Sequence, residues 1–432
     1  MYPFQSSKTS GGAAVSYEGE VFIIESNSSG SGLSAILQAK RLGYSTHFLT
    51  CQPEKYQSFD VNPMEAADQC TLIDTNDVIK LLHFMADKQP LAVLTFDDFH
   101  VFQAAIVAAQ HGLVHTGLDG LVNVRFKEKT RMFTNVSGAG QPVLFEVREP
   151  DEIDQLPSFG LPCVVKPLDE SGSTGVRVCY SKQDFQAAMQ AISVMETVKK
   201  SGYKRAGKVL IEEYVEGDEY SAEMIWDAKA GLWQLIGYTK KYITLPYCIE
   251  VAHSFPYSFG NDMDDSVLAV IRSWLGSLKF LNSAAHVEFK ITANGVPALM
   301  EVNPRPAGGM INELVRYAQG RDNSAALLDL HLGRALPDFP KLLKGKCATV
   351  HFLVPKEHGT VTEVIPPKEV SPGIVASKFT RKEQRVSAGN KKSDLDIGYV
   401  IAVADTQQES FELTKSYAEA CRCMYEQTEE VE

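Results

Sequence analysis

Apolar and polar positions along the first third of the chain follow two alternating periods. Val21–Ile24 is a short apolar run, and a stretch of small residues then leads into an Ala- and Leu-rich segment. Residues 45–50 form a second strand-like run, and the alternation continues through 78–111. Short apolar runs separated by helical stretches are typical of β-α-β units. We therefore predict a parallel α/β domain over residues 20–123, preceded by a loose Ser- and Gly-rich lead-in over 1–19.

The pattern changes after residue 123. Predicted strands and hairpins alternate with helices, such as 184–199 and 266–281, over residues 124–342. The last segment, 343–432, is predicted as strands closed by a terminal helix over 409–425. We therefore expect a protein of mixed class, α/β at its start and α+β in its central and final parts.

Composition excludes several classes of partner. The 432 residues carry 42 Lys and Arg against 54 Asp and Glu, a net charge of −12. Nucleic acids and anionic membranes are bound by clustered cations, so neither is expected as a partner. No apolar stretch approaches the ~20 residues that cross a bilayer, and the first residues lack a secretory pattern, so we predict a cytoplasmic protein. The eight cysteines are dispersed, and we expect reduced thiols, with Cys421 and Cys423 in the terminal helix.

A glycine-rich turn follows the first predicted strand. Gly30-Ser-Gly32-Leu-Ser-Ala35 fits the dinucleotide fingerprint between a strand and a helix. The second strand, however, ends at Thr50-Cys51, where that fingerprint requires an acidic residue for the ribose. A tight turn of small residues is therefore favoured over a dehydrogenase. The N-terminus of the following helix would then be available to a substrate carboxylate.

The strongest chemical pattern is a hairpin over 286–305. Asn294-Gly295 between alternating apolar runs is a strong signal for a two-residue turn. Such a turn places Glu288 opposite Glu301, with Asn303 on the same face. Opposed carboxylates repel unless a cation lies between them. An all-oxygen cluster is the ligand set of Mg²⁺, although a solvated hairpin face is the alternative.

Three further segments add candidate phosphate- and nucleotide-binding groups. Arg305 lies on the same face as Glu301 and Asn303 if the strand continues past Pro304, and there it would donate to phosphoryl oxygens. An apolar strand ends in Lys166 and leads into a loop of three hydroxyl residues and two glycines over 171–175, which suits a phosphate or is an ordinary flexible loop. Residues 209–221 run from an apolar strand into an acidic stretch that suits a purine and its ribose, or is an acidic surface turn. A helix beginning at residue 127 carries three cations, which usually form a solvated face: Lys127, Lys129 and Arg131.

In this order, these segments resemble the ATP-grasp superfamily of carboxylate–amine ligases over nearly the whole chain. The resemblance implies a leading pre-ATP-grasp domain, a two-lobed ATP clamp and a β-rich C-terminal segment that completes the clamp. It also implies ATP and two Mg²⁺ ions, replaceable by Mn²⁺. The implied nucleotide contacts are Lys129, Lys166, Ser171, Gly172, Ser173, Thr174, Gly175, Glu212, Glu213, Tyr214, Val215 and Glu219. The implied metal ligands are Glu288, Glu301 and Asn303.

Residues 247–256 resemble the segment that L-amino-acid ligases place beside the acceptor amino acid. The resemblance implies an ADP-forming ligase that joins a carboxylate to the amine of an L-amino acid through an acyl phosphate. The carboxylate would be an amino acid or an acylated one, such as an acylated 2,3-diaminopropionate, in antibiotic or secondary-metabolite biosynthesis. Arg305 would steady the acyl phosphate, and His253 and Glu250 are candidate bases. Small-molecule substrates and a homodimer are expected; a non-catalytic ATP-binding sensor or scaffold, or a ligase of primary metabolism, is the alternative.

Overall fold

The structure is a computed structural model that describes residues 19–426, apart from 28, 58, 60, 200, 337–345, 381–382 and 389–391. Nearly all of the predicted lead-in over 1–19, and the predicted boundary between residues 342 and 343, therefore lie outside the described residues. The mixed α/β and α+β class is confirmed, because one parallel sheet is followed by three antiparallel sheets.

The first sheet is parallel and has the strand order β3-β2-β1-β4. Its strands are β1 (Glu20–Ile24), β2 (Ser45–Thr50), β3 (Gln69–Leu72) and β4 (Pro90–Leu94). Its connections contain α1 (Ser31–Arg41), η1 (Pro53–Tyr56), α2 (Pro63–Ala66) and α3 (Val78–Met85), and α4 (Val101–Gln110) follows β4. Because the strands are parallel, the residues that follow β1, β2 and β4 meet at one edge of the sheet.

A four-stranded antiparallel sheet forms one wall of the functional site. Helices α5 (Leu118–Arg125) and α6 (Lys127–Asn135) lead into it, and its strand order is β5-β8-β6-β7. Phe185 and Met189 of α7 (Lys182–Ser193) pack on this sheet and bury its apolar face. The strands are β5 (Phe145–Arg148), β6 (Cys163–Pro167), β7 (Arg177–Cys179) and β8 (Val209–Glu213).

An eight-stranded antiparallel sheet forms the opposite wall. Its order is β13-β12-β9-β10-β11-β14-β18-β16. Trp274 and Leu275 of α8 (Asn261–Ser277) pack against Phe289 and its neighbours on one face. The strands are β9 (Asp218–Asp227), β10 (Leu232–Thr244), β11 (Ile249–Tyr257), β12 (Ala284–Ile291), β13 (Pro297–Asn303), β14 (Cys347–Phe352), β16 (Ile374–Phe379) and β18 (Gly398–Ala404).

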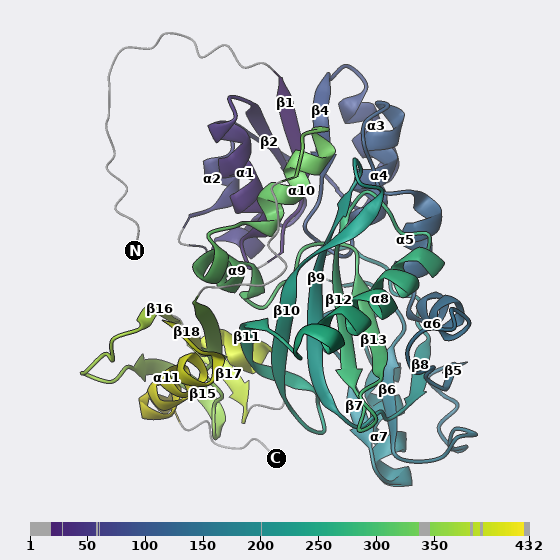
Figure 1. Ribbon diagram of the computed structural model, residues 1–432, viewed down its shortest axis with the longest axis vertical. Coiled ribbons are helices and arrows are strands. Elements are labelled where there is room, and N and C mark those ends of the chain that lie inside the picture. Colours follow the sequence, from purple (N-terminus) through teal and green to yellow (C-terminus); the bar gives the residue numbers. More distant parts are fainter. Residues whose placement is uncertain are drawn as a thin grey trace.

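Two helices from the middle of the chain return to the N-terminal sheet. After α9 (Ile311–Gln319), α10 (Asn323–His331) lies beside α1 and β4, as Figure 1 shows. Leu328 of α10 shares one apolar core with Val21 of β1 and with Val350 and Ile401 of the large sheet. The parallel sheet and the large sheet are therefore joined by a continuous core.

The C-terminal segment differs from its prediction at one point. Helix α11 (Gln407–Ala420) ends before Cys421, and Cys423 lies in strand β19 (Arg422–Glu426), so the predicted helix over 409–425 is wrong at its end. Residues 422–426 alternate between exposed and half-buried positions, the period of a strand, and pair with β15 (His358–Ile365). The small sheet β17-β15-β19 is completed by β17 (Gln384–Ser387), and η2 (Lys392–Ile397) precedes β18. The eight cysteines form no disulfide.

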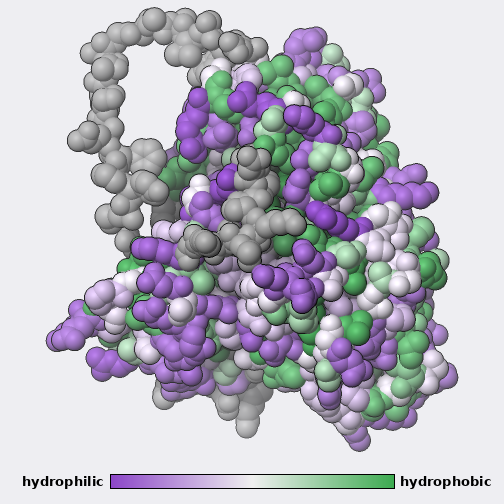
Figure 2. Space-filling view, viewed as in Figure 1, coloured by the Kyte–Doolittle hydropathy of each residue, from purple (hydrophilic) through white to green (hydrophobic). Residues whose placement is uncertain are grey.

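A helix that crosses a bilayer has to be both long and apolar. None of the described helices meets both requirements. Figure 2 shows one face of the molecule, on which hydrophilic residues gather over the C-terminal strands and α11 at the lower left.

Candidate functional site

A pocket lies between the four-stranded sheet and the β12–β13 hairpin. Residues from 127 to 311 line it, so distant parts of the chain meet there. Of the sequence-predicted residues, the pocket wall contains Lys166, Ser171, Gly172, Ser173, Thr174, Glu212, Glu213, Tyr214, Val215, Glu219, Glu250, Glu288, Glu301, Asn303 and Arg305. Lys129, Gly175 and His253 do not line it. Their proposed roles and those of the lining residues stay predictions.

The loop between β6 and β7 covers the pocket with a compact backbone. Gly172, Ser173 and Gly175 all have positive φ, at 64°, 57° and 74°. A left-handed backbone is rare for serine and common for glycine, so the two glycines allow this tight path. Gly175 does not line the pocket, and a Cβ at this position would lie 2.9 Å from Pro167 Cγ. Loops of this kind present successive N–H groups to an anion.

A buried ion-pair network fixes Lys166 at the start of this loop. Glu212, on the neighbouring strand β8, lies 2.5 Å from the Lys166 ammonium and also pairs with Arg131 of α6. Burial by itself raises the pKa of Glu212, but Arg131 and Lys166 outweigh it and lower that pKa to about 2. The Glu212 carboxylate is therefore charged and occupied by two cations, both at least nine-tenths buried.

Helix α6 departs from the solvated face expected for it. Lys127 and Arg131 are buried, whereas Lys129 is half-buried and off the pocket. Residues four apart share one face of a helix, and residues two apart do not, so Lys127 and Arg131 point inward together. Lys127 lies 3.1 Å from Glu301. The geometry thus brings Lys127, rather than the Lys129 that the resemblance implied, to the acidic side of the pocket.

The acidic hairpin has the predicted pairing but a different turn. Glu288 lies opposite Glu301 in the β12–β13 ladder, as predicted. The two-residue turn is wrong, because Ile291 pairs with Pro297 and a longer loop joins them. A β-bulge on β13 at Met300 restores the register.

The same bulge connects the hairpin to α6. Arg131 donates to the carbonyl oxygens of Leu299 and Met300 at 2.6 and 2.9 Å, and so satisfies backbone groups at the irregularity. Asn303 donates to Glu288 at 3.3 Å on the same face. Glu288, Glu301 and Asn303 thus all line the pocket, and Arg131 of α6 holds the β13 backbone next to Glu301.

A buried lysine that the sequence reasoning missed holds three carboxylates together. Lys241 of β10 has a fully buried side chain and lies 2.7 Å from Glu250, 2.9 Å from Glu288 and 3.5 Å from Glu219. Burial alone would lower the pKa of Lys241, but the three carboxylates raise it well above its ordinary value. Its sequence neighbour Lys240 is partly exposed. No local sequence pattern distinguishes the buried lysine from the exposed one.

His286 adds a second buried cation beside Glu288. Its ring nitrogens lie 2.9 Å from Glu223 and 3.0 Å from Glu288. Burial opposes its charge, but these two carboxylates raise the pKa of His286 to about 9. In turn, burial raises the pKa of Glu288, yet Lys241 and His286 hold it well below its usual range. Glu288 is consequently a carboxylate, the form that binds a metal ion.

The acidic segment after β8 packs closely against β12. Lys290 donates to the carbonyl of Val215 at 3.1 Å and lies 4.6 Å from the centre of the Tyr214 ring. Gly217 has a φ of 139°, and a Cβ there would lie 2.1 Å from the carbonyl oxygen of Ile291. Only glycine permits this approach, which brings Tyr214 and Val215 onto the pocket wall.

A residue of the β4–α4 loop holds one side chain of the pocket wall in place. Strand β13 ends at Asn303, so Arg305 does not continue the strand as the sequence reasoning required. Arg305 nevertheless lines the pocket, because Asp98 from the β4–α4 loop binds it through two bonds of 2.8 and 2.5 Å. Such a paired geometry fixes the plane of the guanidinium. Asp98 carried no sequence signal, since it lies 207 residues away.

The two candidate bases are already engaged. His253 is fully buried, with Nδ1 2.8 Å from the carbonyl of Gly309 and Nε2 3.0 Å from Glu250. Glu250 bonds Lys241 with its other oxygen. A base role for His253 would require one of these contacts to open.

A comparison with known protein families matches the part of the chain that carries this geometry. A family model described as an ATP-grasp domain matches residues 159–313, which include the loop after Lys166 and the acidic hairpin. This chain carries an ATP-grasp domain. The ATP-grasp architecture expected from the sequence is thereby confirmed.

Curated relatives match part of the chain. An uncharacterized protein, y4rH, from Sinorhizobium fredii is 28% identical over 253 residues, covering 58% of this chain and 50% of that protein. A D-alanine–D-alanine ligase from Trichlorobacter lovleyi is 29% identical over 170 residues, covering 38% of this chain and 50% of that one. The chain thus spans about half the length of these two relatives.

Solved structures share the fold over nearly the whole chain. An L-amino acid ligase from Bacillus licheniformis superposes with a TM-score of 0.78 at 16% identity, covering 95% of this chain and 100% of that one. A biotin carboxylase domain from Hydrogenobacter thermophilus, in complex with MgADP and bicarbonate, gives 0.69 at 15% identity, covering 94% and 90%. These likenesses establish the fold that surrounds the pocket.

Proposed function

We propose that this chain is an ADP-forming carboxylate–amine ligase that joins a carboxylate to the amine of an L-amino acid. The observation that carries the proposal is the pocket itself, which places a cation and a glycine-rich loop opposite an all-oxygen row and a fixed arginine. The names of two similar proteins, a D-alanine–D-alanine ligase and an L-amino acid ligase, support amide formation between amino acids. The fold alone does not distinguish these from carboxylases.

The donor set fits Mg·ATP. Glu288, Glu301 and Asn303 offer oxygen ligands on one wall, and the glycine-rich loop over Ser171–Thr174 lines the other, in the manner of loops that bind phosphate through the backbone. Bound Mg²⁺ would neutralise charge on the transferring phosphoryl group. The binding of two Mg²⁺ ions and their replacement by Mn²⁺ stay predictions.

The residues of this chain would then divide the reaction between them. Lys166, fixed by Glu212, offers a positive charge beside the loop. A substrate carboxylate attacks the γ-phosphate, ADP leaves and an acyl phosphate forms. The neutral amine attacks the acyl carbon, and phosphate and one amine proton leave, with Arg305 held by Asp98 to donate to the developing oxyanion. The loop excludes water that would hydrolyse the acyl phosphate.

The first experiment measures products. The full chain is incubated with Mg·ATP and pairs of amino acids, and ADP, phosphate and new amides are followed. ADP, phosphate and an amide from an L-amino acid are expected. AMP and pyrophosphate would overturn the acyl-phosphate route, and ATP binding without turnover by any pair would favour a non-catalytic sensor. Turnover of D-alanine alone would favour a ligase of primary metabolism.

Two variants test the metal role. Glu301→Ala is expected to abolish turnover while the chain still folds, whereas Glu363→Ala, an exposed position on β15, leaves turnover unchanged. Activity of the first variant at saturating Mg²⁺ would contradict the assigned role. An acylated 2,3-diaminopropionate as donor, an antibiotic-type pathway, a cytoplasmic location and a homodimer remain predictions.

A further inference from the structure

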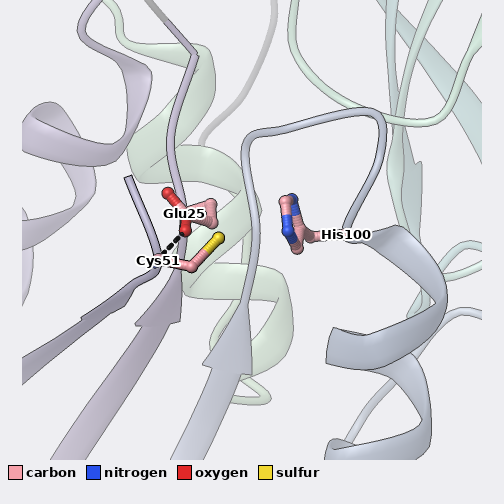
Figure 3. Close-up of side chains that lie close together, drawn as sticks. All are labelled: Glu25, Cys51 and His100. Carbon is pink, nitrogen blue, oxygen red and sulfur yellow. Dashed lines mark hydrogen bonds between the residues drawn. The ribbon is translucent and has the colours of Figure 1, made fainter. Parts of the chain in front are cut away.

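A second cluster of ligating side chains lies outside the pocket, at the carboxyl edge of the parallel sheet. Glu25 directly follows β1, Cys51 directly follows β2 and His100 directly precedes α4, as Figure 3 shows. One ligand atom from each lies within 4.8 Å of the other two. Glu25 and His100 are fully buried, and Cys51 is half-buried. None of the three lines the pocket described above.

The three atoms converge on a single hydroxyl. Thr75 Oγ1 lies 2.9 Å from Glu25 Oε1, 3.0 Å from Cys51 Sγ and 3.1 Å from His100 Nε2. The hydroxyl has one proton, so it can donate to only one of them. Ligands at about 2.0 to 2.3 Å from a tetrahedral zinc ion lie about 3 to 4 Å from one another. The Thr75 hydroxyl thus lies at a ligand-to-ligand distance from each of the three atoms, which themselves lie within 4.8 Å of one another.

Outer contacts orient His100 toward the cluster. His100 Nδ1 lies 2.9 Å from Asp97, and Nε2 lies 3.1 Å from Thr75 Oγ1, on the side of the cluster. Asp97 is itself held by Lys55 at 2.8 Å. A carboxylate behind a histidine is the usual support of a metal-binding imidazole.

Glu25 is oriented in the same way. Its Oε2 accepts from Tyr56 at 2.6 Å and from Thr50 at 3.0 Å, while Oε1 accepts from the Cys51 backbone N–H at 2.6 Å and lies 2.9 Å from Thr75 Oγ1, on the side of the cluster. The backbone of Glu25 has a φ of 58°, a left-handed conformation that non-glycine residues seldom adopt. Such conformations persist where the surroundings enforce them, often at functional positions.

We propose that Glu25, Cys51 and His100 form a binding site for a divalent transition metal ion of the zinc type. Thiolate and imidazole ligands select such ions, whereas the all-oxygen row of the pocket selects Mg²⁺. The two sites therefore differ in ligand chemistry as well as position. Thr75 or a water molecule completes four-fold coordination.

The position of the site suggests what the metal would stabilise. Asp97, which orients His100, is adjacent to Asp98, which holds Arg305. An ion bound to His100 would fix the β4–α4 loop and, through it, the arginine of the pocket. The role is structural and requires no chemistry at the metal.

The test uses Co²⁺ as a spectroscopic probe of the full chain after dialysis against a chelator. A cobalt–thiolate absorption band at a stoichiometry of one is expected in excess Mg²⁺, and Zn²⁺ should displace it. Cys51→Ser is expected to lose the band, whereas Cys70→Ser, an exposed cysteine of β3, retains it. Absence of the band in the unmodified chain, or its persistence in Cys51→Ser, would overturn the proposal.

A second variant keeps the thiol and guards against misfolding. Asp97→Asn leaves all three ligands in place and is expected to weaken Zn²⁺ binding about 10- to 100-fold, measured by competition with a chromophoric chelator. Its circular dichroism spectrum should match that of the unmodified chain. Unchanged Zn²⁺ affinity in this folded variant would contradict the assigned orientation of His100.

Discussion

Replacing Lys241 with methionine tests whether charge holds the acidic side of the pocket together. The side chain is fully buried among Glu219, Glu250 and Glu288, and methionine keeps its length while removing its charge. Removing one partner of a buried ion pair costs about 3 to 5 kcal/mol, because the remaining charges are left unpaired. We expect the free energy of unfolding without metal to fall by that amount.

The adjacent lysine provides a matched control. Lys240 lies on the same strand, but its partner Asp218 is two-thirds exposed and its own side chain is about one-quarter exposed. Partly exposed ion pairs contribute about 1 kcal/mol or less. Urea unfolding of Lys240→Met should therefore shift the midpoint far less than Lys241→Met, with equal slopes.

Two conditions should rescue the Lys241 variant. Mg²⁺ should restore part of its stability, since a divalent cation can neutralise the same carboxylates. Lower pH should do likewise, because burial raises the pKa of Glu219 and Lys241 opposes that rise. Without the lysine, the pKa of Glu219 rises further and a proton takes the place of the ammonium. Equal destabilisation by the two substitutions, or no response to Mg²⁺ and pH, would refute this reasoning.

Three further predictions concern single residues. Asp98→Asn should lower kcat roughly 100-fold, because Arg305 loses its orientation; a change confined to KM would contradict it. Lys127→Ala should reduce kcat/KM for ATP at least about tenfold more than Lys129→Ala, and the reverse order would restore Lys129 as the phosphate contact. Burial lowers the pKa of His331 to about 4 from 6.5, so the unfolded chain takes up its proton first as pH falls. Between pH 7 and pH 5, the unmodified chain should lose about 2 kcal/mol more stability than His331→Asn in urea titrations, and parallel losses would contradict the assignment.

Local patterns determined much of the fold and part of the site. The alternation in the first third of the chain correctly indicated a parallel sheet, and the hairpin spacing placed Glu288 opposite Glu301. This pairing was predicted correctly although the predicted two-residue turn was wrong, because the bulge at Met300 compensates for the longer loop. The terminal helix was predicted too long because a helical period gives way to a strand period after Ala420.

The tertiary structure alone decided which charges meet. Arg131 and Lys241 look like surface cations in the sequence, yet both are buried against carboxylates from other strands. Asp98 of the β4–α4 loop reaches Arg305, 207 residues further along the chain, and Glu25, Cys51 and His100 meet only because parallel strands end at one edge. The periodic pattern of apolar and polar residues reflects secondary structure and burial over a few neighbouring residues. Ion pairs and ligand clusters depend on distances in space, which are set by how the sheets pack.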